Sequence, residues 1–220
     1  MKPRRLQVLR YVVAALVPAV LAASAFVGQK SPAVLSAFFL LLSMAPFFLR
    51  FERSRPQART IVPLAMLAAL AVIGRVAFAF APNFKPTTAI VMVAGFCFGP
   101  SAGFLTGSVT ALASNFFFGQ GAWTPWQMAA WGLAGLLAGL FRPTRAVRSP
   151  LALAGLGAGA SLLYGVIMNL WHVIGFIRPL TGPTVLAAYA AGLPFDLAHA
   201  ASTAVFLLAL GRPWIARIDR

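Results

Sequence analysis

The feature that most constrains this chain is a series of long apolar segments, separated by short breaks that hold most of the basic residues. Of the 220 residues, 60% are hydrophobic and 10% are charged. A soluble domain usually carries about 25% charged residues, so this chain has too little polar surface to cover an aqueous globule. The sequence therefore predicts an all-α, polytopic helical membrane protein and argues against an aqueous globular enzyme.

The basic balance does not indicate a nucleic-acid partner. The net charge is +15, and a strongly basic domain can bind nucleic acid through a positive stripe. Here the basic residues lie in the breaks between apolar segments, where they mark topology instead. One cysteine, Cys97, within an apolar segment, excludes a disulfide framework and a cysteine-based zinc site.

Eight segments are predicted to cross a hydrocarbon core about 30 Å thick. The shortest of them, Thr87–Phe98, is expected to need shielding by its neighbours. Residues 1–60 are interpreted as an N-terminal helix pair with a basic cytoplasmic linker, and residues 61–220 as a six-helix core. The predicted spans are Tyr11–Val27, Ala33–Leu49, Ile61–Ala81, Thr87–Phe98, Ala102–Phe118, Pro125–Phe141, Leu151–Ile177 and Val185–Leu210.

The first span has two interpretations. Basic residues, an apolar stretch and Ala23-Ser24-Ala25 resemble a secretory signal peptide with its cleavage site. An uncleaved first span is the interpretation that we favour. The orientation of the later spans is the same in both.

Charge predicts the orientation. With the N-terminus inside, fourteen basic residues fall on inner segments and three, Lys30, Lys85 and Arg178, on outer ones. The positive-inside rule describes this asymmetry, and anionic lipid attracts the same segments. We therefore expect a multi-pass protein of a prokaryotic cell membrane, with the lipid bilayer as partner and both termini in the cytoplasm.

Small residues recur every four positions, a spacing that lets membrane helices approach closely. Pro100 interrupts one such series and predicts a tight turn between two helices. We expect close packing along the glycines of four helices and along one alanine pair: Gly95, Gly99, Gly103 and Gly107, which span two helices; Gly132, Gly135 and Gly139; Gly155 and Gly159; Ala65 and Ala69.

The chain offers little catalytic chemistry. The run Gly99–Gly103 fits G-x-S-x-G, but it joins two spans instead of a strand and a helix. Neither a Walker A motif nor H-E-x-x-H occurs. His172 and His199 lie at depths too different to share a haem iron, and we expect hydrogen bonds within the bundle. The sequence predicts no catalytic residue, no cofactor and no metal.

A polar and aromatic cluster is predicted at the outer face. Amides and aromatic rings converging at a pocket mouth suit a large, weakly charged organic ligand, although aromatic residues at span ends also form interfacial belts. Arg75 and Asp196 are intramembrane charges within reach of each other by depth, either structural or in contact with ligand. The candidate binding residues are Lys85, Asn115, Gln120, Trp123, Trp126, Gln127, Asn169 and His172.

Two stretches carry a family resemblance. Residues Gly95–Gly107 (GFCFGPSAGFLTG) and Ser114–Met128 (SNFFFGQGAWTPWQM) resemble the substrate-binding S component of energy-coupling factor (ECF) vitamin transporters. The likeness extends over about Ile61–Leu210, and the second stretch is most similar to S components assigned to cobalamin. The two N-terminal spans depart from the family's six-helix pattern.

The resemblance implies a mechanism and partners. Such a subunit captures a vitamin outside, associates with a T component and two ATPases, and topples in the membrane to release its ligand inside. Ala65 and Ala69 match the family's small-residue contact with the T component. The alternatives left open are an S component for another micronutrient, an intramembrane enzyme, a structural subunit and a secondary transporter with an inverted repeat.

Overall fold

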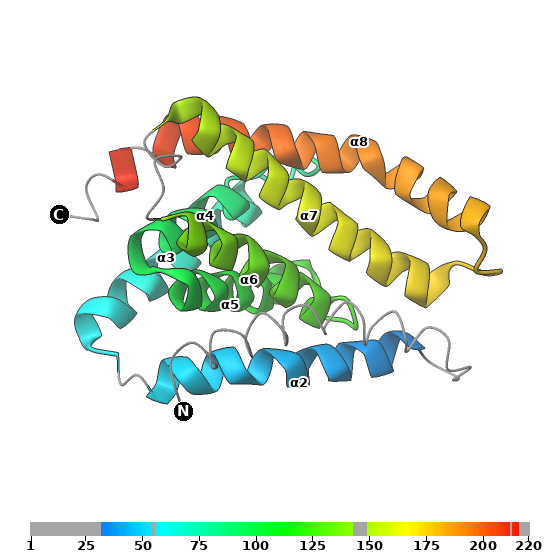
Figure 1. Ribbon diagram of the computed structural model, residues 1–220, viewed down its shortest axis with the longest axis horizontal. Helices are drawn as coiled ribbons and strands as arrows, with labels where there is room; N and C mark the ends of the chain where they lie inside the picture. The colour runs from blue at the N-terminus through cyan, green and yellow to red at the C-terminus, as the bar shows by residue number, and fades with distance from the viewer. Residues whose placement is uncertain (1–31, 54–55, 143–148, 212, 216–220) are drawn as a thin grey trace.

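The computed structural model describes residues 32–53, 56–142, 149–211 and 213–215. These residues form a helical bundle (Figure 1), and each of the seven predicted spans within them overlaps one helix, which confirms the all-α prediction. The first predicted span, Tyr11–Val27, lies outside the described residues. The elements are α2 (Pro32–Arg53), α3 (Ala58–Ala77), α4 (Thr87–Phe98), α5 (Pro100–Phe118), α6 (Thr124–Phe141), α7 (Pro150–Phe176), α8 (Gly182–Phe206) and the π-helical turn η2 (Leu207–Gly211).

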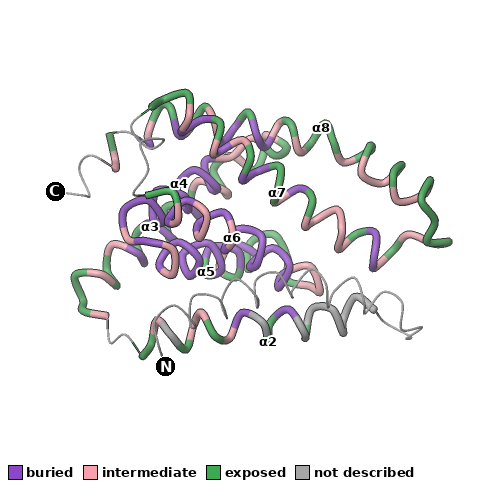
Figure 2. The backbone as a smooth tube through the Cα atoms, viewed as in Figure 1, coloured by how far each residue is buried: buried purple, intermediate pink, exposed green. Residues whose placement is uncertain are grey.

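Three of the described helices are long and apolar enough to cross a membrane: α3, α7, and α8 together with η2. Helix α4 is apolar but has only 12 residues, about 18 Å at 1.5 Å per residue. Eleven of those residues, Thr87 to Cys97, are buried, and Figure 2 shows the buried segments concentrated in α4, α5 and α6. The prediction that Thr87–Phe98 is shielded by its neighbours is therefore confirmed.

Glycines bring α4, α5 and α6 into backbone contact. A Cβ on Gly103 would collide with the backbone of Gly135, and the reverse substitution would collide with Gly103. Gly95 meets the same carbonyl of Gly135. The turn between α4 and α5 is made by Gly99 at φ +91°, followed by Pro100 at the start of α5. The predicted turn and the close approach of these helices are both confirmed.

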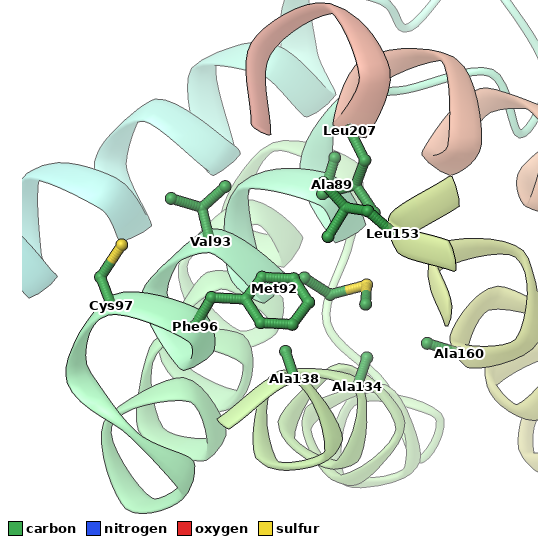
Figure 3. Close-up of a cluster of buried hydrophobic side chains, with 10 residues drawn as sticks. All are labelled: Ala89, Met92, Val93, Phe96, Cys97, Ala134, Ala138, Leu153, Ala160 and Leu207. Carbon is green, nitrogen blue, oxygen red and sulfur yellow. The ribbon is translucent and has the colours of Figure 1, made fainter. Parts of the chain in front are cut away.

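A buried apolar cluster joins this core to α7 and η2. Figure 3 shows Met92 and Phe96 of α4 beside the small residues of α6, with Leu153 and Leu207 approaching from the other side. Leu153 and Leu207 have no exposed surface. This cluster fixes one end of α7, and with it the start of the long α7–α8 hairpin.

One packing prediction is wrong. Nothing lies within 4 Å of a Cβ built on Gly155 or Gly159, so these glycines bring no helix close. Helix α7 approaches its neighbours through Gly157, where a Cβ would collide with Leu207. The two glycines instead face an apolar groove of about 220 Å³ lined by Met92, Leu137, Ala138, Phe141, Gly155, Leu156, Gly159 and Ala160.

Helix α2 packs on the outside of this core, against α5, α6 and α7. Leu40 and Met44 are buried at the contact, and the ring of Phe47 stacks on Phe104 of α5 with centroids 4.1 Å apart. An aromatic pair in this geometry adds about 0.5–1.5 kcal/mol beyond its buried area. Buried apolar side chains and one stacked aromatic pair therefore hold α2 against the core.

Candidate functional site

The polar side chains gather where α3 and α5 end and α4 and α6 begin. The loop after α3 is held against α8, because Asn83 Nδ2 donates to the carbonyl of Phe195 and Ser202 Oγ donates to the carbonyl of Lys85. The turn between α5 and α6 passes through Gly119 at φ +94°. The α3–α4 loop therefore contacts α8, and the α5–α6 turn contacts α7 through Trp123 and Trp171.

Arg75, in the last turn of α3, organises the first part of the site. Its guanidinium donates to Ser114 Oγ and, over 2.7 Å, to Asn115 Oδ1. The guanidinium carbon also lies 4.5 Å from the ring centroid of Phe118 and 4.9 Å from that of Trp131. Cation–π contacts of this kind stabilise a cation that is withdrawn from water.

Thr124 connects two of the predicted residues. Asn115 Nδ2 donates to Thr124 Oγ1 over 3.0 Å, and that hydroxyl donates to Gln120 Oε1 over 2.9 Å. Gln120 Nε2 in turn donates to the carbonyl of Leu112. The amides of Asn115 and Gln120 are therefore held in one network, which fixes the α5–α6 turn.

Lys85 joins the same network through an aromatic ring. Its Nζ lies 5.0 Å from the centroid of Phe118, the ring that Arg75 also contacts. Partial burial lowers the pKa of Lys85, and the nearby Arg75 guanidinium lowers that pKa further. Two cations thus lie around one ring.

The second part of the site lies deeper and joins the core to the hairpin. Trp131 Nε1 donates to Thr88 Oγ1 over 2.9 Å, and Thr88 Oγ1 shares a 2.7 Å hydrogen bond with His199 Nε2. The ring of Tyr164 packs on both Trp131 and His199, with centroids 5.2 and 4.8 Å away. The predicted hydrogen bond within the bundle is confirmed for His199. For His172, which is exposed, the described residues show no such bond.

Gln127 extends this deeper part. Its Nε2 donates to Tyr164 Oη over 2.9 Å, and its Oε1 is buried without a hydrogen-bond partner among the described residues. A buried amide oxygen without a partner costs about 1–3 kcal/mol. Gln127 therefore presents an acceptor that a bound molecule could satisfy.

Arg75 and Asp196, expected from their depths to lie within reach of each other, form no ion pair among the described contacts. Asp196 Oδ2 accepts from Asn169 Nδ2 of α7 over 2.8 Å, whereas Arg75 donates to Ser114 and Asn115. Gly165 of α7 leaves the space for this, because a Cβ there would collide with the Asp196 carboxylate. Arg75 and Asp196 were predicted at similar depths in the membrane, but similar depth does not determine which sides of two helices face each other.

Three further predicted residues lie near the hairpin or in the core. Trp123 contacts Trp171 edge-on, with centroids 6.0 Å apart, and the indole Nε1 of Trp171 is buried without a hydrogen-bond partner. His172 is exposed and stacks on Phe176. Trp126 has no exposed surface and lies in an apolar cluster, so its role in the structure is packing in the core.

Tyr164, Thr88 and Trp131 are not among the predicted site residues, although these side chains link the two parts of the site. Each has a polar atom within an otherwise apolar span, and such atoms need a partner inside the bilayer. That requirement is the signal that could have identified them. The sequence contains no pattern that shows which of these helices pack against one another.

The fold and this cluster define a class: a helical, multi-pass membrane protein with a polar and aromatic cluster where several helix ends meet. The profile of the family described as ECF transporter, substrate-specific component, matches residues 59–211. The chain belongs to this family, whose members are components of transporters and not enzymes.

Curated relatives match part of the chain. A UPF0397 protein of Vibrio atlanticus is 35% identical over 89 residues, which cover 38% of this chain and 48% of the relative. A UPF0397 protein of Aliivibrio salmonicida is 34% identical with the same coverage. The chain thus spans about half the length of the curated relatives it matches. No solved structure matches the chain significantly.

Proposed function

We propose that this chain captures a vitamin at the outer face of a prokaryotic cell membrane and delivers it for ATP-driven uptake. The observation that carries the proposal is the continuous cluster from Lys85 through Arg75 and Trp131 to His199, inside an otherwise apolar bundle. Charged and polar groups within a membrane-spanning bundle are energetically costly, and they commonly mark a functional site. Family membership supports a transport function over the other classes considered.

Cobalamin is the vitamin that we propose first. The aromatic rings of Trp123 and Trp171 would pack on its flat macrocycle and lower base, and the amides of Gln120 and Gln127 would pair with its peripheral amides. Asn115, which is buried and bonded to Arg75 and Thr124, would hold the network behind them. In this proposal Lys85, Asn169 and His172 line the entrance, and Trp126 supports the indole cluster. Another vitamin or micronutrient is the alternative.

The proposed orientation places both termini in the cytoplasm, with the α3–α4 loop and the α5–α6 turn outside. The asymmetry of basic residues supports this orientation. A ligand would then reach the cluster from the outer face, and release inside would require the partner subunits. A T component and two ATPases are the partners that we propose.

Ala65 and Ala69 are the proposed contact with the T component. Both are exposed on α3, next to exposed Met66 and Leu70, so a partner helix could approach closely at this face. Replacing both alanines with leucine should abolish co-purification with the T component and leave vitamin binding intact. The control is the same double change at Ala187 and Ala191, an exposed pair with equal spacing on α8. Loss of the complex in the control as well would contradict the assignment.

Isothermal titration of the detergent-purified protein with cobalamin, riboflavin and biotin tests the proposed function. Tight one-to-one binding of one vitamin, without nucleotide, is expected. Binding of riboflavin or biotin alone would keep the function and replace the ligand. A folded protein that binds no vitamin would contradict the function and favour a structural subunit.

A double variant tests the site. Trp123→Ala with Gln120→Ala should weaken binding at least tenfold, about 1.4 kcal/mol. Phe116→Ala with Phe117→Ala is the matched control, because both rings are highly exposed at the same end of α5. Unchanged affinity in the first variant would contradict the site assignment.

A further inference from the structure

The charges around Phe118 are unbalanced. Arg75 and Lys85 both lie within 5.0 Å of its ring centroid, and neither cation is paired with a carboxylate among the described residues. The groups that accept from Arg75 are the neutral oxygens of Ser114 and Asn115. Neutral acceptors satisfy hydrogen bonds but leave the positive charge uncompensated.

The acidic residues of the chain do not supply the missing charge. The sequence holds three of them. Glu52 is exposed near the end of α2, before the start of α3, and Asp196 is engaged by Asn169. The third, Asp219, lies outside the described residues. The described residues around Phe118 therefore carry two positive charges and no negative one.

Two cations at close range in a poorly solvated place repel each other, because Coulomb energies rise as the local dielectric constant falls. Burial is the larger cause of the lowered pKa of Lys85, and the Arg75 guanidinium lowers that pKa further, as repulsion between two nearby cations does. Arginine and lysine both recognise carboxylates and phosphates, and arginine does so with a planar fork of donors. An anion would remove the repulsion and use the remaining donors of both side chains.

We propose that the transported substrate carries an anionic group, a carboxylate or a phosphate ester, that binds between Arg75 and Lys85. This inference rests on the proposed function and names the substrate class of the same site. The phosphodiester of cobalamin meets the requirement, and so do vitamins with a carboxylate. A neutral or cationic vitamin does not.

A second group without a partner, the side-chain oxygen of Gln127, indicates which kind of atom the substrate places deeper in the site. Gln127 is 6% exposed, and its unpaired Oε1 is an acceptor. Gln127 binds Tyr164, whose ring packs on Trp131, the same ring that Arg75 contacts. The substrate is therefore anionic at the Lys85 end and offers an N–H or O–H donor toward Gln127.

Matched pairs of compounds test the charge. Titrations of the full chain in detergent use biotin against biotinamide and pantothenate against panthenol for the carboxylate. The phosphate ester of riboflavin against riboflavin, and cobinamide phosphate against cobinamide, test the phosphate; thiamine is the cationic probe. We expect one anionic compound to bind at least about tenfold more tightly than its uncharged analogue. The pair that shows this difference identifies the anion as a carboxylate or a phosphate.

Variants test the residues. Lys85→Met should weaken binding of that compound at least about tenfold and remove most of its dependence on sodium chloride. Arg178→Met is the matched control, because it removes an exposed cation at the end of α7. Lys85 is half-buried in a loop, so its replacement should leave the thermal unfolding temperature unchanged. Arg75→Lys, which keeps the charge, should bind more tightly than Arg75→Gln.

The outcomes separate this inference from the proposed function. Tightest binding by panthenol, riboflavin or thiamine, with Lys85→Met equal to the wild type, would overturn the anionic substrate and leave the transport function intact. Failure of every compound to bind the folded protein would overturn the proposed function, and the inference with it.

Discussion

The helices α4 to α6 and the α7–α8 hairpin are packed in different ways. Eleven of the twelve residues of α4 are buried, against four of the twenty-five in α8. In the core, backbones touch across glycines such as Gly103 and Gly135. In the hairpin, side-chain hydrogen bonds such as Asn169 to Asp196 join helices with exposed outer faces. The core is held by backbone contact across glycines, whereas the hairpin adds polar side-chain contacts to its apolar packing at Leu153 and Leu207.

The candidate site lies across the boundary between these regions. Trp131 and Thr88 belong to the core, and Tyr164 and His199 to the hairpin. Figure 1 shows the hairpin running past the α5–α6 turn. A change in the position of the hairpin would therefore alter the site while the core stays intact, which is compatible with the proposed capture and release of a substrate.

The largest effect should come from the core glycines. Gly135→Ala puts a methyl group into the backbone of Gly103, and overpacking costs about 1–3 kcal/mol or more. Thermal unfolding in detergent should show a midpoint lowered by roughly 2–10 °C. Gly159→Ala is the control, because nothing lies near its Cβ, and its midpoint should be unchanged or slightly raised. Equal losses in both variants would break the contrast between the two regions.

The fold could be predicted from the sequence because hydrophobic length and turn residues are local signals. Thr87–Phe98 and the break at Pro100 appear in the structure at the predicted residues. The glycine pattern of α5 and α6 predicted close approach correctly, but that of Gly155 and Gly159 did not. Small residues permit contact, and only the position of the neighbouring helix decides whether it occurs.

The site could be predicted in part. The polar run from Asn115 to Gln127 showed which residues gather at the α5–α6 turn, because they are close in sequence. The partners of Arg75 and Asp196 could not be predicted, because they depend on which sides of distant helices face each other. For the same reason Tyr164 was missed. Tertiary packing determines these side-chain partners, and local sequence patterns do not show how distant helices pack.

A smaller effect is expected from the polar contact in the hairpin. Asp196→Ala and Asn169→Ala each remove the interhelical hydrogen bond, and such bonds in membranes average about 0.6 kcal/mol with a maximum of about 1.7. Unfolding of both single variants and of the double variant should give a coupling energy in this range. A loss as large as that of Gly135→Ala would show that polar contacts hold the hairpin as firmly as shape holds the core.

The smallest effect should be a dependence of affinity on pH at Lys85, whose backbone carbonyl accepts from Ser202 at the boundary between the two regions. Burial and the Arg75 guanidinium lower its pKa from the ordinary 10.5, so Lys85 loses its charge at a lower pH than a free lysine does. An anion binds the charged form, so affinity should be full at neutral pH and fall as the pH rises through the lowered pKa. We expect a loss of a few-fold, on the order of 0.5–1 kcal/mol, in titrations with the anionic compound between about pH 7 and about pH 10.

The control for this dependence is Lys85→Met, which removes the titrating group and should give a flat profile over the same range. His199 and Tyr164 also lie near the two cations, and both remain in that variant, so any slope that persists belongs to them. Lys85→Arg should keep the wild-type affinity at neutral pH and should not lose it as the pH rises, because a guanidinium stays charged throughout. A wild-type profile as flat as that of Lys85→Met would indicate that the anion binds Arg75 alone, in the last turn of α3 and away from the boundary with the hairpin.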